Sequence, residues 1–131
     1  MTGDRATWRT EFQLRFRDFD YLGHMTATSY LAFFEEARVA WLAEGTGDPR
    51  PAYVVAAQHL EFEREVLPAD GPVTVVIEPA GSGAHRVEVR EEMRGADGAL
   101  RARSTATLVM WDRAARRPRC VSAAERRLFG G

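Results

Sequence analysis

Apolar and polar positions follow two different spacings in the first part of the chain. Residues 11–17 alternate between polar and apolar side chains, a period of two that is typical of a strand with one buried face, and we place this strand at about 8–17. Its apolar side is formed by Phe12, Leu14 and Phe16. From residue 27 the apolar spacing becomes three and four, which is the period of a helix. The pattern predicts a helix at about 27–45 that is apolar on most of its surface and therefore buried.

The two ends of this helix carry residues that start and stop helices. Thr26 and Thr28 are candidate N-caps, because a threonine oxygen accepts a hydrogen bond from an unpaired N–H of the first turn. Gly45 or Gly47 can end the helix, since glycine adopts the left-handed conformation at low cost. Pro49 follows and prevents the helix from continuing.

The rest of the chain alternates mainly with a period of two. Four further strands are predicted at about 53–66, 72–80, 85–95 and 99–112, followed by a short helix at 122–128. Short turns such as Asp97-Gly98 join most of these strands, so we expect antiparallel neighbours. One helix beside five strands indicates the α+β class, with a curled antiparallel sheet of five or six strands wrapped around one long central helix.

Composition and charge narrow the class of protein. With 131 residues, 45% of them hydrophobic and 28% charged, the chain is expected to form one domain over residues 1–131. The first ten residues lack the apolar run of a signal peptide, and no window approaches the roughly 20 apolar residues of a membrane span. A single cysteine, Cys120, excludes an intrachain disulfide, so we expect a cytoplasmic protein. The net charge of −1 predicts no nucleic-acid partner.

Residues 18–30 hold the side chains best suited to chemistry. Asp18 and Asp20 lie between the first strand and the helix, and Gly23 and His24 follow them. A carboxylate at this place can attack a carbonyl group or activate a water to do so. The unpaired N–H groups of the helix start can stabilise the oxyanion that forms. The alternative is that both aspartates only form the turn and cap the helix.

The same stretch resembles a family signature. The chain reads Asp18-x-Asp20-x-x-Gly23-His24-Met25, followed by Tyr30 and by Leu31-x-x-Phe34-Glu35-Glu36-Ala37-Arg38. This pattern resembles the motif of the 4-hydroxybenzoyl-CoA thioesterase-like branch of the hotdog superfamily. The likeness continues more weakly through residues 60–62 and 67–71 and the Asp97-Gly98 turn to the final strand, so it covers most of the chain. Thr26 and Ala27 depart from the pattern, which usually has two asparagines there.

The resemblance implies a fold, an activity and a catalytic group. Members have a hotdog fold and form homodimers with active sites at the subunit interface, and the sequence leaves open whether two dimers pair into a tetramer. Asp20 matches the catalytic carboxylate, as nucleophile or general base, and the backbone N–H of Ala27 matches the group that polarises the thioester carbonyl. His24 matches a histidine that orients the site or contacts substrate, unless it is an interior residue. The implied substrate is an acyl-CoA or acyl-carrier thioester, with no cofactor beyond the CoA of the substrate.

Four further residues are predicted to bind substrate, although some of them can have a purely structural role instead. They are Gly23, Thr26, Tyr30 and His59. Tyr30 can instead pack the helix against the sheet, and His59 can instead face solvent from the polar side of its strand. Thr26 can still cap the helix, so the oxyanion geometry can survive the loss of asparagine.

Basic residues are distributed unevenly. All 18 are arginine, and several crowd the C-terminal part of the chain, namely Arg113, Arg116, Arg117, Arg119, Arg126 and Arg127. One interpretation is a solvated basic tail. The other is that some of these guanidinium groups hold the phosphates of a CoA-like ligand, which arginine binds bidentately.

An acyl-CoA thioesterase without a metal is the function that the sequence predicts. Motifs for other hydrolases do not occur in it, among them H-x-x-x-H, a glycine-rich phosphate loop and G-x-S-x-G. Two alternatives share the fold. One is a protein that binds acyl thioesters without hydrolysing them, and the other is a thioesterase that acts on acyl-carrier protein.

Overall fold

This computed structural model describes residues 7–130, which form six strands and two α-helices. The strands are β1 (Trp8–Phe12), β2 (Tyr53–Phe62), β3 (Val73–Ser82), β4 (Arg86–Arg94), β5 (Leu100–Asp112) and β6 (Arg117–Pro118). The helices are α1 (Ala27–Thr46) and α2 (Ala123–Phe129), and single 3-10 turns occur at Phe16–Asp18 and Pro68–Asp70. This order agrees with the predicted sequence of strand, long helix and strands.

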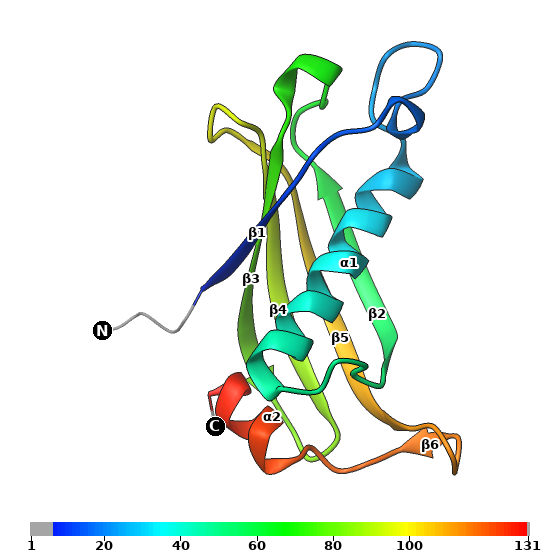
Figure 1. The fold of residues 1–131 in the computed structure, drawn as a ribbon, viewed down its shortest axis with the longest axis vertical. Coiled ribbons are helices and arrows are strands. Elements are labelled where there is room, and N and C mark those ends of the chain that lie inside the picture. The colour runs from blue at the N-terminus through cyan, green and yellow to red at the C-terminus, as the bar shows by residue number, and fades with distance from the viewer. Residues whose placement is uncertain (1–6, 131) are drawn as a thin grey trace.

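All strands of the main sheet are antiparallel, in the order β1-β3-β4-β5-β2. β6 pairs with the end of β5. The sheet curls around α1, which lies lengthwise along its concave face (Figure 1). β1 and β2 are its two edges. The predicted α+β hotdog architecture is confirmed.

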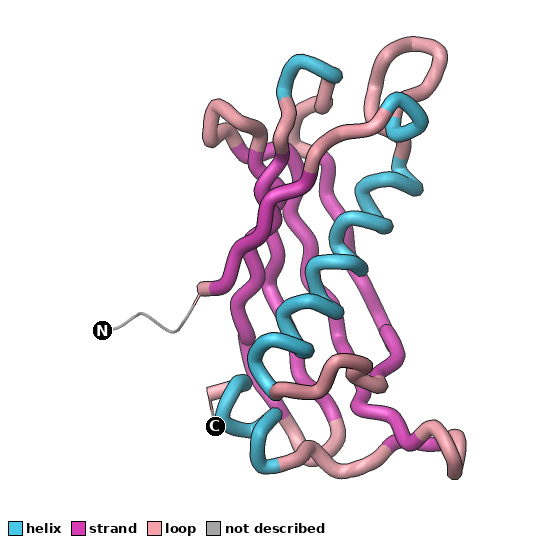
Figure 2. The backbone as a smooth tube through the Cα atoms, viewed as in Figure 1, coloured by secondary structure: helices cyan, strands magenta, loops and turns pink. Residues whose placement is uncertain are grey.

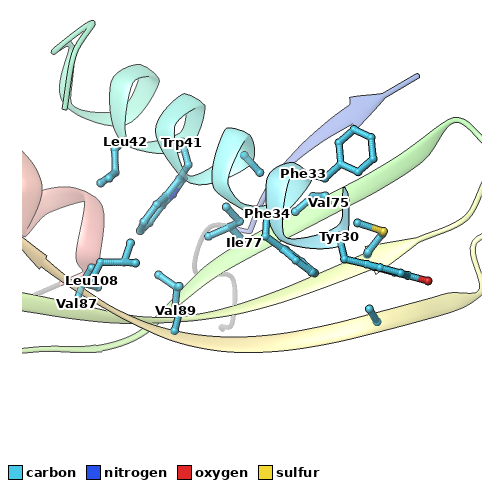
Figure 3. Packing of buried hydrophobic residues seen from close by; sticks show 14 of the residues in the cluster. Tyr30, Phe33, Phe34, Trp41, Leu42, Val75, Ile77, Val87, Val89 and Leu108 are labelled. Carbon is cyan, nitrogen blue, oxygen red and sulfur yellow. The ribbon is translucent and has the colours of Figure 1, made fainter. Parts of the chain in front are cut away.

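Alternation along the strands places every second side chain against the helix. The sheet contributes Val73, Val75, Ile77, Val87, Val89, Met93, Ala102, Leu108 and Met110 to the core. The helix contributes Tyr30, Phe33, Phe34, Ala37, Trp41 and Leu42 (Figure 3). Removing these apolar side chains from water is the main driving force for folding. The sheet curls because a helix that is apolar on most of its surface has to be covered on several sides.

One ion pair lies inside this core. Arg38 of α1 and Glu91 of β4 are both buried, with Nε–Oε2 and Nη2–Oε1 distances of 2.6 and 2.9 Å. Ser104 donates to Oε1 of Glu91 at 2.8 Å, and Gln58 of the edge strand β2 donates to Ser104 Oγ at 3.0 Å. Both carboxylate oxygens of Glu91 therefore have donors, which a buried charge requires.

The first strand is shorter than predicted. β1 ends at Phe12 rather than near residue 17, because the chain enters the 3-10 turn at Phe16–Asp18. The carboxylate of Asp18 holds this turn by accepting the backbone N–H of Arg15 at 2.7 Å. Phe16, predicted on the buried side, is 98% exposed. Leu14 packs against the core as predicted.

The strand after the helix also ends early. β2 stops at Phe62 rather than at residue 66, because the N–H groups of Glu63 and Arg64 both donate to the carbonyl of Arg101, at 2.8 and 3.1 Å. This shared acceptor breaks the regular ladder. The two-residue strand β6 was not predicted, since two residues are too few to show a period.

Both ends of α1 are capped by predicted residues. Thr26 is the N-cap, and its Oγ1 accepts the backbone N–H of Ser29 at 3.1 Å. Gly47 ends the helix in the left-handed conformation with φ of 80°. α2 packs Phe129 against Trp41, with ring centroids 5.8 Å apart. Within residues 7–130, neither helix combines the length and the apolar character needed to cross a membrane.

Candidate active site

Residues 19–26 form a compact loop between the first 3-10 turn and α1. Phe19 and Met25 form an antiparallel bridge, and the N–H of Asp20 donates to the carbonyl of His24 at 2.9 Å. Gly23 turns the chain with φ of 85°, a conformation that side chains disfavour. Figure 2 shows that this loop lies at the same end of the sheet as the connection from β2 to β3.

Asp18 is buried at the base of this loop. Its carboxylate pairs with the Arg15 guanidinium at 3.0 Å and accepts the Ser29 hydroxyl at 3.0 Å. Burial alone would raise the pKa of Asp18, but the hydrogen bonds from Arg15 and Ser29 outweigh it and lower the pKa below its ordinary value. Every contact of Asp18 serves the turn and the helix start. The structural role predicted as an alternative for both aspartates therefore describes Asp18.

Asp20 is exposed on the same loop. Its Oδ1 accepts the backbone N–H groups of His24 at 3.0 Å and Leu22 at 2.9 Å. Hydrogen bonding from the His24 backbone is the largest influence and lowers the pKa of Asp20 below its ordinary value. In the described part of the chain no donor bonds to Oδ2. Asp20 thus presents an ionised carboxylate with one oxygen available to a ligand.

The helix start next to this loop has backbone N–H donors without a hydrogen-bond acceptor among the described residues. Thr26 satisfies the N–H of Ser29, but within residues 7–130 the N–H groups of Ala27 and Thr28 have no hydrogen-bond partner. Both residues are exposed. The partial positive charge of a helix N-terminus adds to these donors. Together they can polarise a carbonyl group or bind an oxyanion.

A hollow of about 430 Å³ lies between the start of α1 and the end of β2. Ala27, His24, Tyr30 and Phe62 are among its lining residues. Tyr30 and Phe62 meet edge to face with ring centroids 4.9 Å apart, and Figure 3 shows the Tyr30 side chain reaching from the helix across the sheet. Burial raises the pKa of the Tyr30 phenol. Aromatic walls beside free N–H groups suit an apolar acyl group with a polar carbonyl.

A second hollow, of about 460 Å³, borders the loop. Asp20 and Gly23 line it together with the apolar side chains of Phe16, Phe19 and Pro68. His24 contacts residues of both hollows, because its backbone N–H donates to Asp20 of this hollow and it lines the other hollow together with Ala27. The imidazole Nε2 lies 2.9 Å from Oε1 of Glu65.

Most of the predicted site residues lie together, and one lies apart. Gly23, Thr26 and Tyr30 belong to the loop, to the helix cap and to the hollow that contains Ala27. His59 is exposed on the outer face of the sheet, where its Nε2 lies 3.1 Å from Oε2 of Glu61. It lines a different hollow, with Arg90 and Arg103.

Two site residues escaped the sequence prediction. Phe62 lines the hollow that contains Ala27, and Oε1 of Glu65 lies 2.9 Å from Nε2 of His24. Phe62 belongs to the stretch 60–62 that continues the family likeness, so a signal for it existed. Glu65 had none, because its partner is far away in the sequence.

No cluster of three or more potential metal-ligating His, Cys, Asp or Glu side chains occurs in residues 7–130.

The family of the chain follows from its sequence as well as its fold. Residues 14–125 match the model of the thioesterase-like superfamily. This match includes the loop 19–26, the whole of α1 and every strand after β1. The chain therefore belongs to the thioesterase-like superfamily, and this membership makes it a thioester hydrolase.

Several solved bacterial structures share the fold. A thioesterase from Thermus thermophilus in complex with coenzyme A and Zn is 27% identical, with a TM-score of 0.77 over 94% of this chain and 97% of that one. A predicted thioesterase from Bacillus stearothermophilus is 22% identical, with a TM-score of 0.83 and 94% of both chains covered. A 1,4-dihydroxy-2-naphthoyl-CoA thioesterase from Synechocystis is 19% identical, with a TM-score of 0.79 over 95% and 96% of the chains. No curated protein matches this chain in sequence.

Proposed function

We propose that this protein is an acyl-CoA thioesterase in which Asp20 and the helix start of α1 act on the thioester. The observation that carries the proposal is that an exposed carboxylate lies on the loop 19–26, and backbone donors unpaired within the described residues lie at the helix start that directly follows this loop. Asp20 is ionised because its pKa is lowered, and the Ala27 N–H has no partner in residues 7–130. A nucleophile or base beside an oxyanion site is the minimum that thioester hydrolysis requires.

The reaction needs few protein groups because thiolate is a good leaving group. The thioester oxygen accepts the N–H of Ala27, which makes the carbonyl carbon more electrophilic. Asp20 either attacks that carbon or removes a proton from a water that attacks it. When Asp20 attacks, the C–S bond breaks and a mixed anhydride forms, and a water then hydrolyses this anhydride to restore the Asp20 carboxylate and release the free acid. When water attacks, the C–S bond breaks and the free acid is released directly. In both cases the sulfur leaves as thiolate and takes up a proton. His24 keeps the loop in place through its backbone bond to Asp20 and its ring contact with Glu65.

The edge strand β2 supports a homodimer. It has ten residues, and its first six contain no charge and no proline. Val54 and Val55 are exposed on it. A long apolar edge is a template for another strand, and two copies related by a twofold axis can each provide the other's antiparallel partner. We therefore propose a dimer in which the two β2 strands pair, next to the hollow that Phe62 lines.

Coenzyme A is the thiol that we propose for the substrate. The family and the complex of the Thermus thermophilus thioesterase with coenzyme A support this choice. An acyl-carrier thioester remains the alternative substrate, and the cytoplasmic location predicted from the sequence remains a prediction.

A panel of thioesters tests the proposal. Thiol release would be measured from acetyl, medium-chain, long-chain and aromatic CoA esters, and from one ester of a pantetheine-loaded carrier protein. We expect hydrolysis of at least one CoA ester, and Asp20→Asn should reduce its kcat by about 10²- to 10⁴-fold. The matched control is Asp48→Asn, since Asp48 is also exposed and its Oδ1 also accepts a backbone N–H two residues on, that of Arg50.

Two outcomes would change the assignment. Full activity in Asp20→Asn would remove Asp20 from the mechanism. Binding of CoA esters by calorimetry without thiol release would favour a protein that holds acyl thioesters and does not hydrolyse them.

A further inference from the structure

The turn between β5 and β6 carries a group of exposed arginines. Residues 113–116 form the turn, and Arg113, Arg116 and Arg117 are exposed there. We call these three residues the arginine turn. In Figure 1 the β6 hairpin projects at the end of the sheet opposite to the start of α1. This charged projection has no part in the chemistry of the loop in its own chain.

The arginine turn is held in a fixed shape. Oδ1 of Asp112 accepts the N–H groups of Ala114 and Ala115, both at 2.9 Å, and the N–H of Arg116 donates to the carbonyl of Asp112 at 2.8 Å. The Arg113 guanidinium donates to the carbonyl of Arg50. The backbone from which the guanidinium groups project is therefore preorganised, which lowers the conformational entropy lost when a ligand binds.

Its guanidinium groups also lack the acidic partners that eight other arginines of residues 7–130 have. Ion pairs in residues 7–130 involve Arg15, Arg38, Arg86, Arg90, Arg94, Arg101, Arg103 and Arg119. The arginine turn has no ion pair in that part of the chain. Asp112, the nearest acid in sequence, uses Oδ1 to bind the turn backbone. The turn is therefore a site of free positive charge suited to an anion.

The position of the turn matters in the proposed dimer. It is attached at the start of β2, because Trp111 N–H donates to the carbonyl of Ala52 at 3.1 Å. The hollow that contains Ala27 lies at the other end of β2, beside Phe62. Ten residues of strand, about 33 Å, separate the two ends in one chain. Antiparallel pairing of two β2 strands brings the start of each strand beside the end of the other.

We propose that the arginine turn of each subunit binds the phosphates of the coenzyme A whose thioester occupies the hollow of the other subunit. This inference rests on the proposed function and its β2 dimer. The pantetheine arm of CoA separates the thioester from the phosphates, so one ligand can reach both places. Guanidinium groups bind phosphate oxygens with two parallel hydrogen bonds.

The outer side of the turn suits phosphates better than the hollow behind it. That hollow measures about 440 Å³ and contains Arg113 and Arg119, but Asp48, Asp112 and Glu125 also line it. Arg119 is already paired with Glu125 at 2.7 Å. The remaining carboxylates would repel phosphate there, which leaves the exposed tip as the binding surface.

Removing the phosphates from the substrate provides the first test. The triple variant Arg113→Ser/Arg116→Ser/Arg117→Ser should raise KM for the best acyl-CoA at least tenfold, with kcat within about twofold. The same acyl group on pantetheine, which has no nucleotide, should show unchanged kinetics. Arg126→Ser/Arg127→Ser is the control, because it removes exposed charge from α2 at the same end of the chain. Unchanged KM for acyl-CoA in the triple variant, or an equal loss with acyl-pantetheine, would overturn the proposal.

Binding of coenzyme A alone separates this inference from catalysis. Calorimetry should show CoA binding at least tenfold weaker in the triple variant than in the wild type, equivalent to about 1.4 kcal/mol. If the wild type binds CoA in this way but hydrolyses no thioester, the proposed activity is wrong and the arginine turn still binds phosphates. If CoA binding is the same in both proteins, the arginine turn has no such role.

Cross-linking tests whether the turn faces the other subunit. In a Cys120→Ser background, Arg116→Cys and Arg64→Cys would be combined and treated with a short bis-maleimide. Arg64 lines the hollow that contains Ala27 and lies past the end of β2, too far from the turn of its own chain to be bridged. A covalent dimer that needs both cysteines is expected. Failure to form it while the protein is dimeric in solution would contradict the arrangement.

Discussion

The first turn and the middle of α1 treat polar groups in opposite ways. In the middle, Arg38 lies in the core with its charge paired to Glu91, and Ser104 and Gln58 extend the network. At the first turn, the N–H of Ala27 is exposed and has no partner in residues 7–130. The same helix therefore carries a closed polar network, in which the charged groups are paired with each other, and an open donor, which has no partner in the described residues.

This difference between the two parts of α1 indicates where a ligand can bind. A buried polar group without a partner costs stability, so in the middle of the helix Nε and Nη2 of Arg38 and both carboxylate oxygens of Glu91 are hydrogen-bonded. The helix start can leave donors free because water reaches them. Only such free groups can be offered to a substrate.

The same contrast recurs within the loop, two residues apart. Asp18 is buried, and its carboxylate is bonded to the Arg15 guanidinium and the Ser29 hydroxyl. Asp20 is exposed and uses one oxygen on the loop backbone. We therefore assign structure to Asp18 and propose chemistry for Asp20.

Breaking the closed network should have the largest effect. Arg38→Met leaves the Glu91 carboxylate buried without its guanidinium, and we expect a loss of about 3–5 kcal/mol in the free energy of unfolding. Urea titration followed by tryptophan fluorescence, at one fixed protein concentration, measures it. The double variant Arg38→Met/Glu91→Met should recover most of the loss. A single variant within about 1 kcal/mol of the wild type would show that the pair is not a closed unit.

Removing the open donor should affect the rate and spare the fold. Ala27→Pro deletes the unpaired N–H at the first helical position, where proline is tolerated, and the extended Thr26 before it (ψ of 152°) suits a following proline. We expect kcat to fall about 10²- to 10³-fold. Ala27→Gly keeps the N–H and serves as the control. Equal rates in the proline and glycine variants would locate the oxyanion site elsewhere.

Changing the structural aspartate should cost stability. Asp18→Asn removes the charge that Arg15 pairs with, and we expect a loss of about 1–3 kcal/mol at pH 7. The pKa of Asp18 is lowered in the folded protein, so its carboxylate stabilises the fold above the unfolded value near 3.9 and loses this effect as pH falls through the folded pKa. The difference between variant and wild type should therefore shrink below about pH 4 in urea titrations. A difference that stays constant down to pH 2 would contradict an ionised Asp18.

The smallest effect is expected from mild acid. Because the pKa of Asp20 lies below its ordinary value, the carboxylate stays ionised from pH 7 to pH 5, and kcat/KM should change little in this range. It should fall only when the pH approaches the lowered pKa, below about 4. A steep fall between pH 7 and pH 5 would speak against Asp20 as the titrating group.

Local signals predicted most of the elements of this fold. The helix was expected at about 27–45 and spans Ala27–Thr46, with Thr26 and Gly47 as its caps. The central strands β3, β4 and β5 were placed within a few residues, because alternation and turn residues act over short distances. The ends of β1 and β2 were predicted too long, since the hydrogen bonds that stop them involve the side chain of Asp18 and the carbonyl of Arg101.

The site was predicted in the same uneven way. The loop with Asp20 and His24 and the helix start at Ala27 are local in sequence, so a motif could point to them. Glu65, the partner of His24, is distant in sequence, and nothing in the chain marks it. His59 was a candidate, but the structure turns it to the outer face of the sheet. A strand pattern tells which residues share a face and does not tell which face the ligand meets.

By itself, the sequence determined where the helix begins and ends, which strand residues share a face, and that a carboxylate precedes a helix start. Backbone preference and hydrophobic spacing act over a few residues, and these features depend on nothing else. The tertiary structure decided which of the two aspartates is buried, which glutamate receives Arg38, and which strands are left as edges. These outcomes depend on contacts between residues far apart in the chain, and such contacts form only when the whole sheet has closed around the helix.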